Sequence, residues 1–122
     1  MSKDRYDRVK HLVEVEDDIL AVFTVTAKKE NGFENLWIAK NAKITRDLVD
    51  NVFVGLQRIG TIRVDADRKK IVGNLKWTIH ESNDIRTLII YEKDRDVVAL
   101  IKSNKSLSET ADNILGYYYE DL

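Results

Sequence analysis

Histidine is the first residue type to consider for catalysis, and the chain has only two, His11 and His80. They fall on different predicted elements, and no Gly-x-Ser-x-Gly turn is present to expose a nucleophilic serine. His80 lies on the polar side of its predicted strand, which favours a solvated histidine. The absence of cysteine excludes thiol catalysis, disulfides and thiolate metal sites. The sequence therefore predicts no catalytic residues, and we expect that the protein is not an enzyme.

One pair of carboxylates is spaced so that it could bind a divalent cation. Asp65 and Asp67 share a face if their segment is extended, and carboxylate oxygens are ligands for Mg²⁺. Arg68, Lys69 and Lys70 follow them directly, so a charged surface turn with local ion pairs is the preferred interpretation. The glycine-rich phosphate-binding motifs are absent from the sequence. We therefore predict no metal and no cofactor.

The same basic run lies near Trp77, and basic surfaces with aromatic residues are typical of nucleic-acid binding. Acidic residues interrupt the run, however, and Trp77 falls on the apolar face of its strand, which favours a core tryptophan. Trp37, beside a predicted edge hairpin, is more ambiguous. With 20 Lys and Arg against 21 Asp and Glu, the net charge is -1. That balance gives no whole-molecule attraction to nucleic acid or anionic lipid, so we expect neither as a partner.

Length and composition fit one α+β domain spanning residues 1–122. Hydrophobic residues at 43% can form a core, and charged residues at 34% imply a strongly solvated surface. The charged N-terminus is not followed by the apolar stretch of a signal peptide. No apolar run approaches the roughly 18 residues of a membrane helix. The expected location is the cytoplasm.

Hydrophobic periodicity predicts three helices and five strands. The helices are expected at 4–14, at 46–59 with Thr45 as its cap, and from a capping box that begins at Ser106. Gly116 could end the last helix early, and the Tyr117-Tyr118-Tyr119 run is interpreted as part core and part rim. Segment 62–65 is either a short strand or an irregular connector. The strands are expected at 19–27, 33–39, 71–80, 85–92 and 97–102.

The burial character of these strands predicts their order in the sheet. Short connections make the first two strands neighbours, and likewise the last three. The third strand is half polar and should lie at an edge, whereas the first is apolar on both faces and needs a second neighbour. Because the fourth strand is already paired on both sides, the first must pair with the fifth. The expected sheet is antiparallel, in the order 2-1-5-4-3, with helices on both faces.

This order of elements resembles the Roadblock/dynein light-chain family and its profilin-like relatives. The matching pieces are the Asn31-Gly32 hairpin, the amphipathic helix 46–59, the meander 85–103 and the capped helix from Ser106. The charged segment 63–70 departs from the compact family plan. The resemblance implies a dimer in which the central helices pair and the third strands join edge to edge. It also implies a role as a scaffold or regulator for small GTPases or motor complexes.

The predicted function is a non-enzymatic, homodimeric protein-interaction module whose partner could be a small GTPase. The apolar stripe of helix 46–59 is about 140° wide, which is broad enough to meet a sheet and a further surface at its margin. Two alternatives stay open: a monomer whose strand edge is protected by Asn74 and Lys76, and a profilin-like or PAS-like sensory domain that binds a small ligand in its core. The expected dimer-interface residues are Val52, Gly55, Leu56, Ile59, Leu75 and Trp77.

Overall fold

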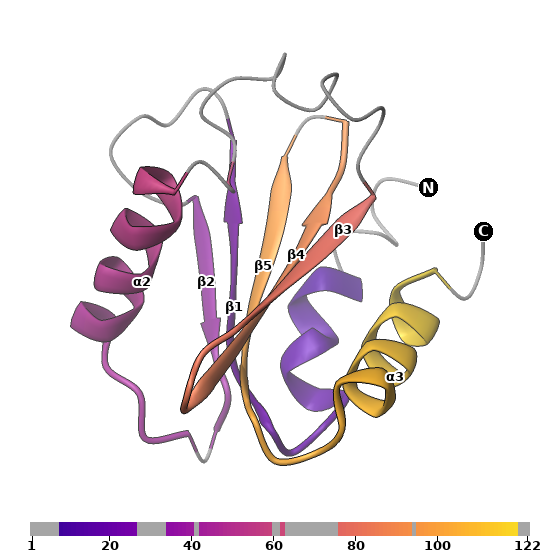
Figure 1. Ribbon diagram of the computed structural model, residues 1–122. Helices are drawn as coiled ribbons and strands as arrows, with labels where there is room; N and C mark the ends of the chain where they lie inside the picture. The colour runs from indigo at the N-terminus through magenta and orange to yellow at the C-terminus, as the bar shows by residue number, and fades with distance from the viewer. Residues whose placement is uncertain are drawn as a thin grey trace.

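The five strands of the computed structural model form one antiparallel sheet, in the order β2-β1-β5-β4-β3 (Figure 1). The structure describes residues 8–26, 34–40, 42–59, 62, 76–93 and 95–119. The predicted strand order is confirmed. The elements in chain order are η1 (His11–Glu14), β1 (Ile19–Val25), β2 (Asn35–Ile38), α2 (Arg46–Arg58), β3 (Trp77–Glu81), β4 (Ile85–Tyr91), β5 (Asp96–Lys102) and α3 (Leu107–Tyr119).

The strand pairings follow from which strands are apolar on both faces. β1 pairs with β2 on one side, where Val22 lies opposite Trp37, and with β5 on the other, where Phe23 lies opposite Val98. β4 lies between β5 and β3. The side chains of β4 and β5 are almost all buried, whereas those of β3 are exposed or half-buried. The edge of the sheet is therefore the position that suits β3, because exposed and half-buried side chains are tolerated there.

Helices cover both faces of the sheet (Figure 1). α2 packs on one face, where Phe53 meets Phe23 edge to face with ring centroids 6.2 Å apart. η1 and α3 pack on the other face, where Leu12, Ile114 and Tyr118 are fully or almost fully buried. The molecule thus has two hydrophobic cores separated by the sheet. Burial of this apolar surface supplies most of the favourable free energy of folding.

Both predicted helix caps are present. The Thr45 hydroxyl accepts a hydrogen bond of 3.2 Å from the Leu48 amide, and the Ser106 hydroxyl accepts one of 3.2 Å from the Glu109 amide. These bonds satisfy amides that the first turn of a helix leaves without a partner. α3 does not stop at Gly116 but continues to Tyr119.

The aromatic end of α3 explains that continuation. Tyr118 is 2% exposed, and Tyr117 and Tyr119 are partly buried against the same core, so the predicted mixture of core and rim is confirmed. The Tyr117 hydroxyl donates to the Arg8 carbonyl at 3.2 Å, and the Arg8 guanidinium lies 5.6 Å from the centre of the Tyr117 ring. Packing at three consecutive tyrosines outweighs the helix-breaking tendency of one glycine, which costs about 1 kcal/mol.

Several predictions from the sequence fall partly or wholly outside the described residues. The first helix is described only from residue 8, and after residue 10 it continues as the 3-10 helix η1. Of segment 62–65 only Ile62 is described, as a bend that is 3% exposed. Two further stretches lie outside the described residues: the Asn31-Gly32 turn and the segments 63–70 and 71–75. The Asp65 and Asp67 pair belongs to the second stretch and so lies outside as well.

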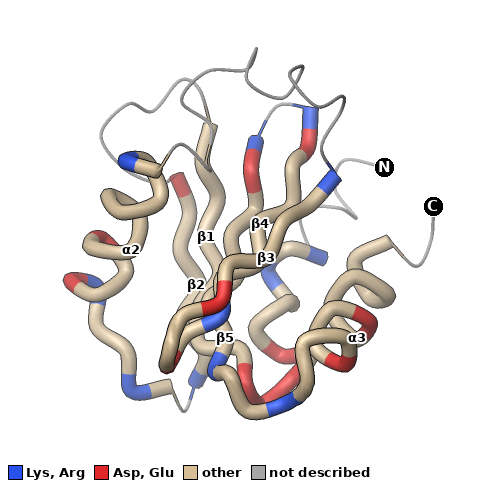
Figure 2. Tube along the Cα trace, in the orientation of Figure 1, with Lys and Arg blue, Asp and Glu red and all other residues tan. Residues whose placement is uncertain are grey.

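Charged residues of both signs are interspersed over the described chain (Figure 2). On α3 itself they are acidic, namely Glu109 and Asp112, while β3 carries Glu81 at its end. None of the described helices combines the length and the apolar character that a bilayer crossing requires.

Candidate interaction surface

The β3 strand has one side that no other described strand pairs with. On its paired side, the Tyr91 amide donates to the Lys76 carbonyl at 2.9 Å and the Ser82 amide donates to the Ile85 carbonyl at 3.1 Å. Antiparallel pairing alternates along a strand, so even-numbered residues from Lys76 to Ser82 direct their backbone groups toward β4. The outward-directed backbone groups belong to Trp77, Ile79 and Glu81.

Thr78 and His80 point toward the α2 face of the sheet, in a small polar cluster with Tyr91. The Thr78 hydroxyl lies 3.3 Å from the His80 Nε2 atom and 3.3 Å from the Tyr91 hydroxyl. Both distances are at the long end of the hydrogen-bond range. Burial raises the pKa of the Tyr91 phenol above its ordinary value. His80 is half-buried, so it is less exposed than a fully solvated histidine.

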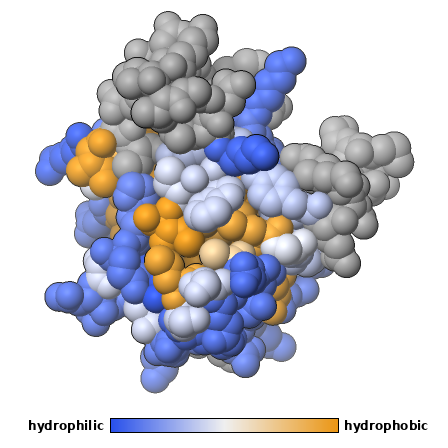
Figure 3. Space-filling model, turned by 45° about the vertical axis from the view of Figure 1, so that its right-hand side comes forward, coloured by the Kyte–Doolittle hydropathy of each residue, from blue (hydrophilic) through white to orange (hydrophobic). Residues whose placement is uncertain are grey.

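Trp77 and Ile79 point toward the opposite face, where they border an open groove between β3 and α3. The groove has a volume of about 770 Å³ and is apolar along its floor (Figure 3). Trp77 is 40% exposed and Leu107, at the start of α3, is 49% exposed. The prediction of a core tryptophan at position 77 is therefore wrong. The groove is lined by Trp77, Ile79, Leu107, Ser108, Ala111, Asp112, Leu115 and Gly116.

The four expected interface residues in α2 and at its C-terminal end divide into buried and exposed positions. Leu56 is 5% exposed and belongs to the core between α2 and the sheet, and Val52 is half-buried against that core. Gly55 is exposed, with nothing within 4 Å of the position that a Cβ atom would occupy. Ile59 is 62% exposed. Only the last two offer themselves fully to a second molecule.

Exposed apolar residues on α2 extend this surface beyond the residues named from the sequence. Leu48 is 38% exposed, and helical spacing places it on the same side as Val52, Gly55 and Ile59. Leu48 also lines a hollow with Asp84 and Ile85, so the first turn of α2 lies next to the β3–β4 turn. We call Leu48, Val52, Gly55 and Ile59 the α2 side stripe.

The structure therefore brings the expected interface residues together only in part. The α2 side stripe lies on one face of the sheet, and Trp77 lies on the other face, at the open edge. Leu75 lies outside the described residues. Leu107 and Ile79 were not named as interface residues from the sequence. For Leu107 a signal was available, because an apolar residue directly after the Ser106 cap occupies a helix turn that is usually exposed.

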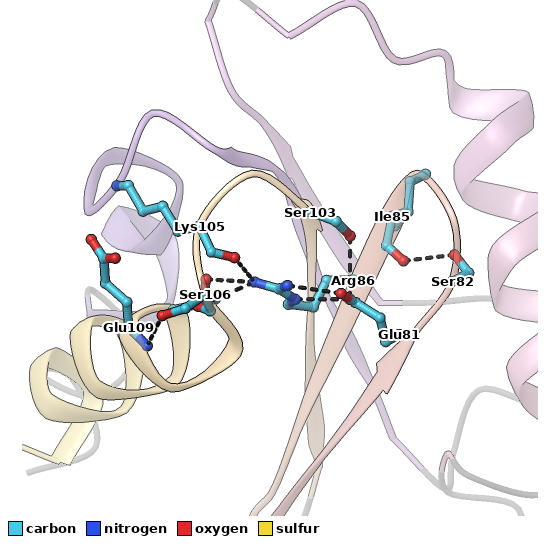
Figure 4. A network of polar contacts seen from close by, with 9 residues as sticks. Glu81, Ser82, Ile85, Arg86, Ser103, Lys105, Ser106 and Glu109 are labelled. Atoms are coloured by element: carbon cyan, nitrogen blue, oxygen red, sulfur yellow. Dashed lines mark hydrogen bonds and ion pairs between the residues drawn. The ribbon is translucent and has the colours of Figure 1, made fainter.

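Arg86 connects the open edge to the start of α3 (Figure 4). Its side chain is 4% exposed and donates two hydrogen bonds of 2.8 Å to the Glu81 carboxylate. It also donates to the Thr110 hydroxyl at 2.8 Å and to the Lys105 carbonyl at 3.0 Å. Bidentate pairs of this kind have a fixed geometry. Glu81 and α3 are thus held at a set distance from each other.

The Glu81–Arg86 pair changes the protonation behaviour of both groups. The hydrogen bonds from Arg86 hold the pKa of the Glu81 carboxyl below its ordinary value, and those same bonds raise the pKa of Arg86. Glu81 is therefore ionised at neutral pH and accepts a further hydrogen bond of 3.2 Å from the Ser103 hydroxyl.

A second polar connection joins the segment before β1 to α3. The buried Glu16 carboxylate accepts hydrogen bonds from the Lys105 ammonium group, at 3.1 Å, and from the Asn113 amide. The hydrogen bond with Glu16 raises the pKa of Lys105. Among the described residues, no group of three His, Asp or Glu side chains is placed to hold a metal ion. The charged residues of this region serve to fix α3 on the sheet.

The fold and the open β3 edge define a class: the chain has the fold of Roadblock/LC7 domains. Among solved structures, MglC from Myxococcus xanthus matches with a TM-score of 0.62 and 9% sequence identity, over 94% of this chain and 93% of MglC. MglB from Myxococcus xanthus matches with a TM-score of 0.59 and 12% identity, over 94% and 85% of the two chains. A Roadblock/LC7 domain from Streptomyces avermitilis matches with a TM-score of 0.56 and 11% identity, over 89% and 87%. No protein-family model and no curated protein sequence matches the chain.

Proposed function

We propose that this chain is a non-enzymatic interaction module that forms a homodimer through the β3 edge and the α2 side stripe. The observation that carries the proposal is the β3 edge, which no described strand covers and where the backbone groups of Trp77, Ile79 and Glu81 point away from the sheet. An unpaired strand edge is a template for another strand. The likeness to Roadblock/LC7 structures supports the same arrangement, and one similar structure is MglB in a tetrameric arrangement.

Two-fold symmetry makes the two contact regions compatible. Antiparallel pairing of β3 with the β3 of a second copy keeps equivalent faces of the two sheets on the same side. The α2 helices of both copies then lie on one face of a continuous sheet. Because Leu48, at the start of the α2 side stripe, lies next to the β3–β4 turn, we expect the two stripes to face each other across the symmetry axis. Such a contact covers Leu48 and Ile59, which are exposed in the single chain.

We propose a small GTPase as the partner of this dimer. The dimer would act as a non-catalytic scaffold or regulator of the GTPase. The support is the resemblance in element order to the Roadblock/dynein light-chain family, together with the matching fold of the Roadblock/LC7 domain. The net charge of -1 provides little long-range attraction to any partner. Recognition is therefore expected to depend on shape and apolar contact rather than on overall charge.

The absence of cysteine from the chain allows a direct test of the dimer, because an introduced cysteine is the only thiol. The variant Ile79→Cys should form a disulfide-linked dimer on mild oxidation, since paired residues of antiparallel strands lie within disulfide reach. Val54→Cys is the matched control, being 41% exposed on the far side of α2, and should form none. Sedimentation of the wild-type chain should show a dimer. A monomer at all concentrations, with no cross-link at position 79, would contradict the proposal.

The partner is tested by affinity purification of the wild-type dimer from its own cells with GDP or a non-hydrolysable GTP analogue. We expect a small GTPase to be enriched in one nucleotide state. The same purification with the Ile59→Asn variant shows whether this enrichment depends on the dimer. Enrichment of a small metabolite by the intact protein in native mass spectrometry, without any GTPase, would favour a sensory domain instead.

A further inference from the structure

We propose that the groove between β3 and α3 receives the Trp77 side chain of a second copy of this chain. The inference rests on the proposed homodimer. It adds what fills the β3–α3 groove, a surface that the dimer would otherwise leave open. It follows from the register of the open edge, the path of α3 along β3 and two exposed apolar residues.

The register is set by the outward-directed backbone groups. A second β3 strand can use the three outward residues of the described strand, Trp77, Ile79 and Glu81, only if Ile79 lies opposite the Ile79 of the partner copy. Trp77 of one copy then lies opposite Glu81 of the other. Paired residues of antiparallel strands project from the same face of the sheet. The incoming tryptophan therefore enters on the α3 face, beside Glu81.

The groove runs along β3, and each of its two ends can be assigned to residues of β3 and α3. Arg86 joins Glu81 to Ser106 and Thr110, so the start of α3, with Leu107, lies at the Glu81 end. From Leu107 to Gly116 the helix rises about 13 Å, and β3 extends about 13 Å from Glu81 to Trp77. The chain's own Trp77 therefore lies at the Gly116 end of the groove, and the Leu107 end is open to the tryptophan of the partner copy.

The chemistry of that end suits an indole ring. Leu107 is 49% exposed and Trp77 is 40% exposed, and one contact between copies covers both. A tryptophan side chain buries roughly 150–250 Å² of largely apolar surface. The adjacent Glu81 carboxylate already accepts two hydrogen bonds from Arg86, so the incoming ring does not strip water from an unpaired charge. The groove is thus closed at its two ends by the Trp77 residues of two copies.

Trp77 fluorescence tests this arrangement in a Trp37→Phe background, which leaves Trp77 as the only tryptophan. As the protein concentration rises, its emission should shift to shorter wavelength and its quenching by iodide should fall, with the same midpoint as dimer formation by sedimentation. A dimer whose Trp77 stays as accessible to iodide as in the monomer would overturn the groove proposal and leave the homodimer standing. Absence of a dimer would overturn both.

A second measurement separates groove occupancy from dimer affinity. In the disulfide-linked Ile79→Cys dimer, Leu107→Asp should shift Trp77 emission to longer wavelength and raise iodide quenching, while Leu107→Met should restore the wild-type values. Asp is favourable in the first turn of a helix, so this variant leaves α3 intact. Unchanged Trp77 fluorescence in Leu107→Asp would refute the contact. A sedimenting dimer that does not cross-link at position 79 would refute the register and therefore the inference.

Discussion

Replacing Ile59 with asparagine should weaken the proposed homodimer while leaving the single chain folded. Ile59 is 62% exposed and follows the last residue of α2, so the single chain loses little packing from the change. Complete burial of an isoleucine side chain is worth about 1.5–3 kcal/mol. The exposed part therefore represents about 1–2 kcal/mol per copy, or about 2–4 kcal/mol in a symmetric dimer. The dimer dissociation constant should rise about 30- to 700-fold.

Val54→Asn is the matched control for this prediction. Val54 is 41% exposed on the same helix, but helical geometry directs it away from both the sheet and the α2 side stripe. Sedimentation equilibrium over a dilution series measures both variants, and urea unfolding at low concentration checks that each chain is folded. Equal dissociation constants for Ile59→Asn and Val54→Asn would refute the assignment of the side stripe to the interface.

Three further predictions concern the stability of the fold, each measured by urea unfolding. Phe53→Ala should destabilise the chain by about 3–5 kcal/mol, because it removes a ring that is 4% exposed; a loss below 1 kcal/mol would contradict this packing. Thr45→Ala should cost about 1 kcal/mol through loss of the α2 cap, while Thr45→Asp should retain most of it. The pKa of Glu81 is lowered in the folded chain, so its pairing with Arg86 stabilises the fold. This stability is fully present at a pH above the ordinary pKa of 4.5. It is lost as the pH falls through the lower pKa of the folded chain. Glu81→Gln should therefore reduce the pH dependence in that acidic window, and an unchanged pH profile would argue against the pairing.

The sheet order could be predicted because burial character and short connections leave few alternatives. β1 is apolar on both faces and so requires two neighbours, and β3 has a half-polar pattern that suits an edge. The positions of α2 and α3 followed from their hydrophobic spacing and their caps at Thr45 and Ser106. These are local signals that the tertiary structure reinforces.

The burial of Trp77 could not be predicted in the same way. Alternation along a strand shows which face a residue points to, but not whether a helix covers that face at the edge of the sheet. α3 leaves a groove beside β3, so Trp77 points to the apolar face and is still 40% exposed. For the same reason, the width of the stripe on α2 did not distinguish buried Leu56 from exposed Ile59. Coverage depends on where neighbouring elements end, and the sequence does not report this directly.

In the part of the chain that the structure describes, the sheet has two borders, β3 and β2, and the proposed dimer uses only one of them. The described part of β3 covers Trp77–Glu81 and the described part of β2 covers Asn35–Ile38. Joining two chains through β3 would use both β3 borders, so the described strands of the pair would form a ten-stranded unit with β2 at each end. The proposed contact uses the same patch on both copies and closes on itself, so we expect this route to yield a pair and not a fibre.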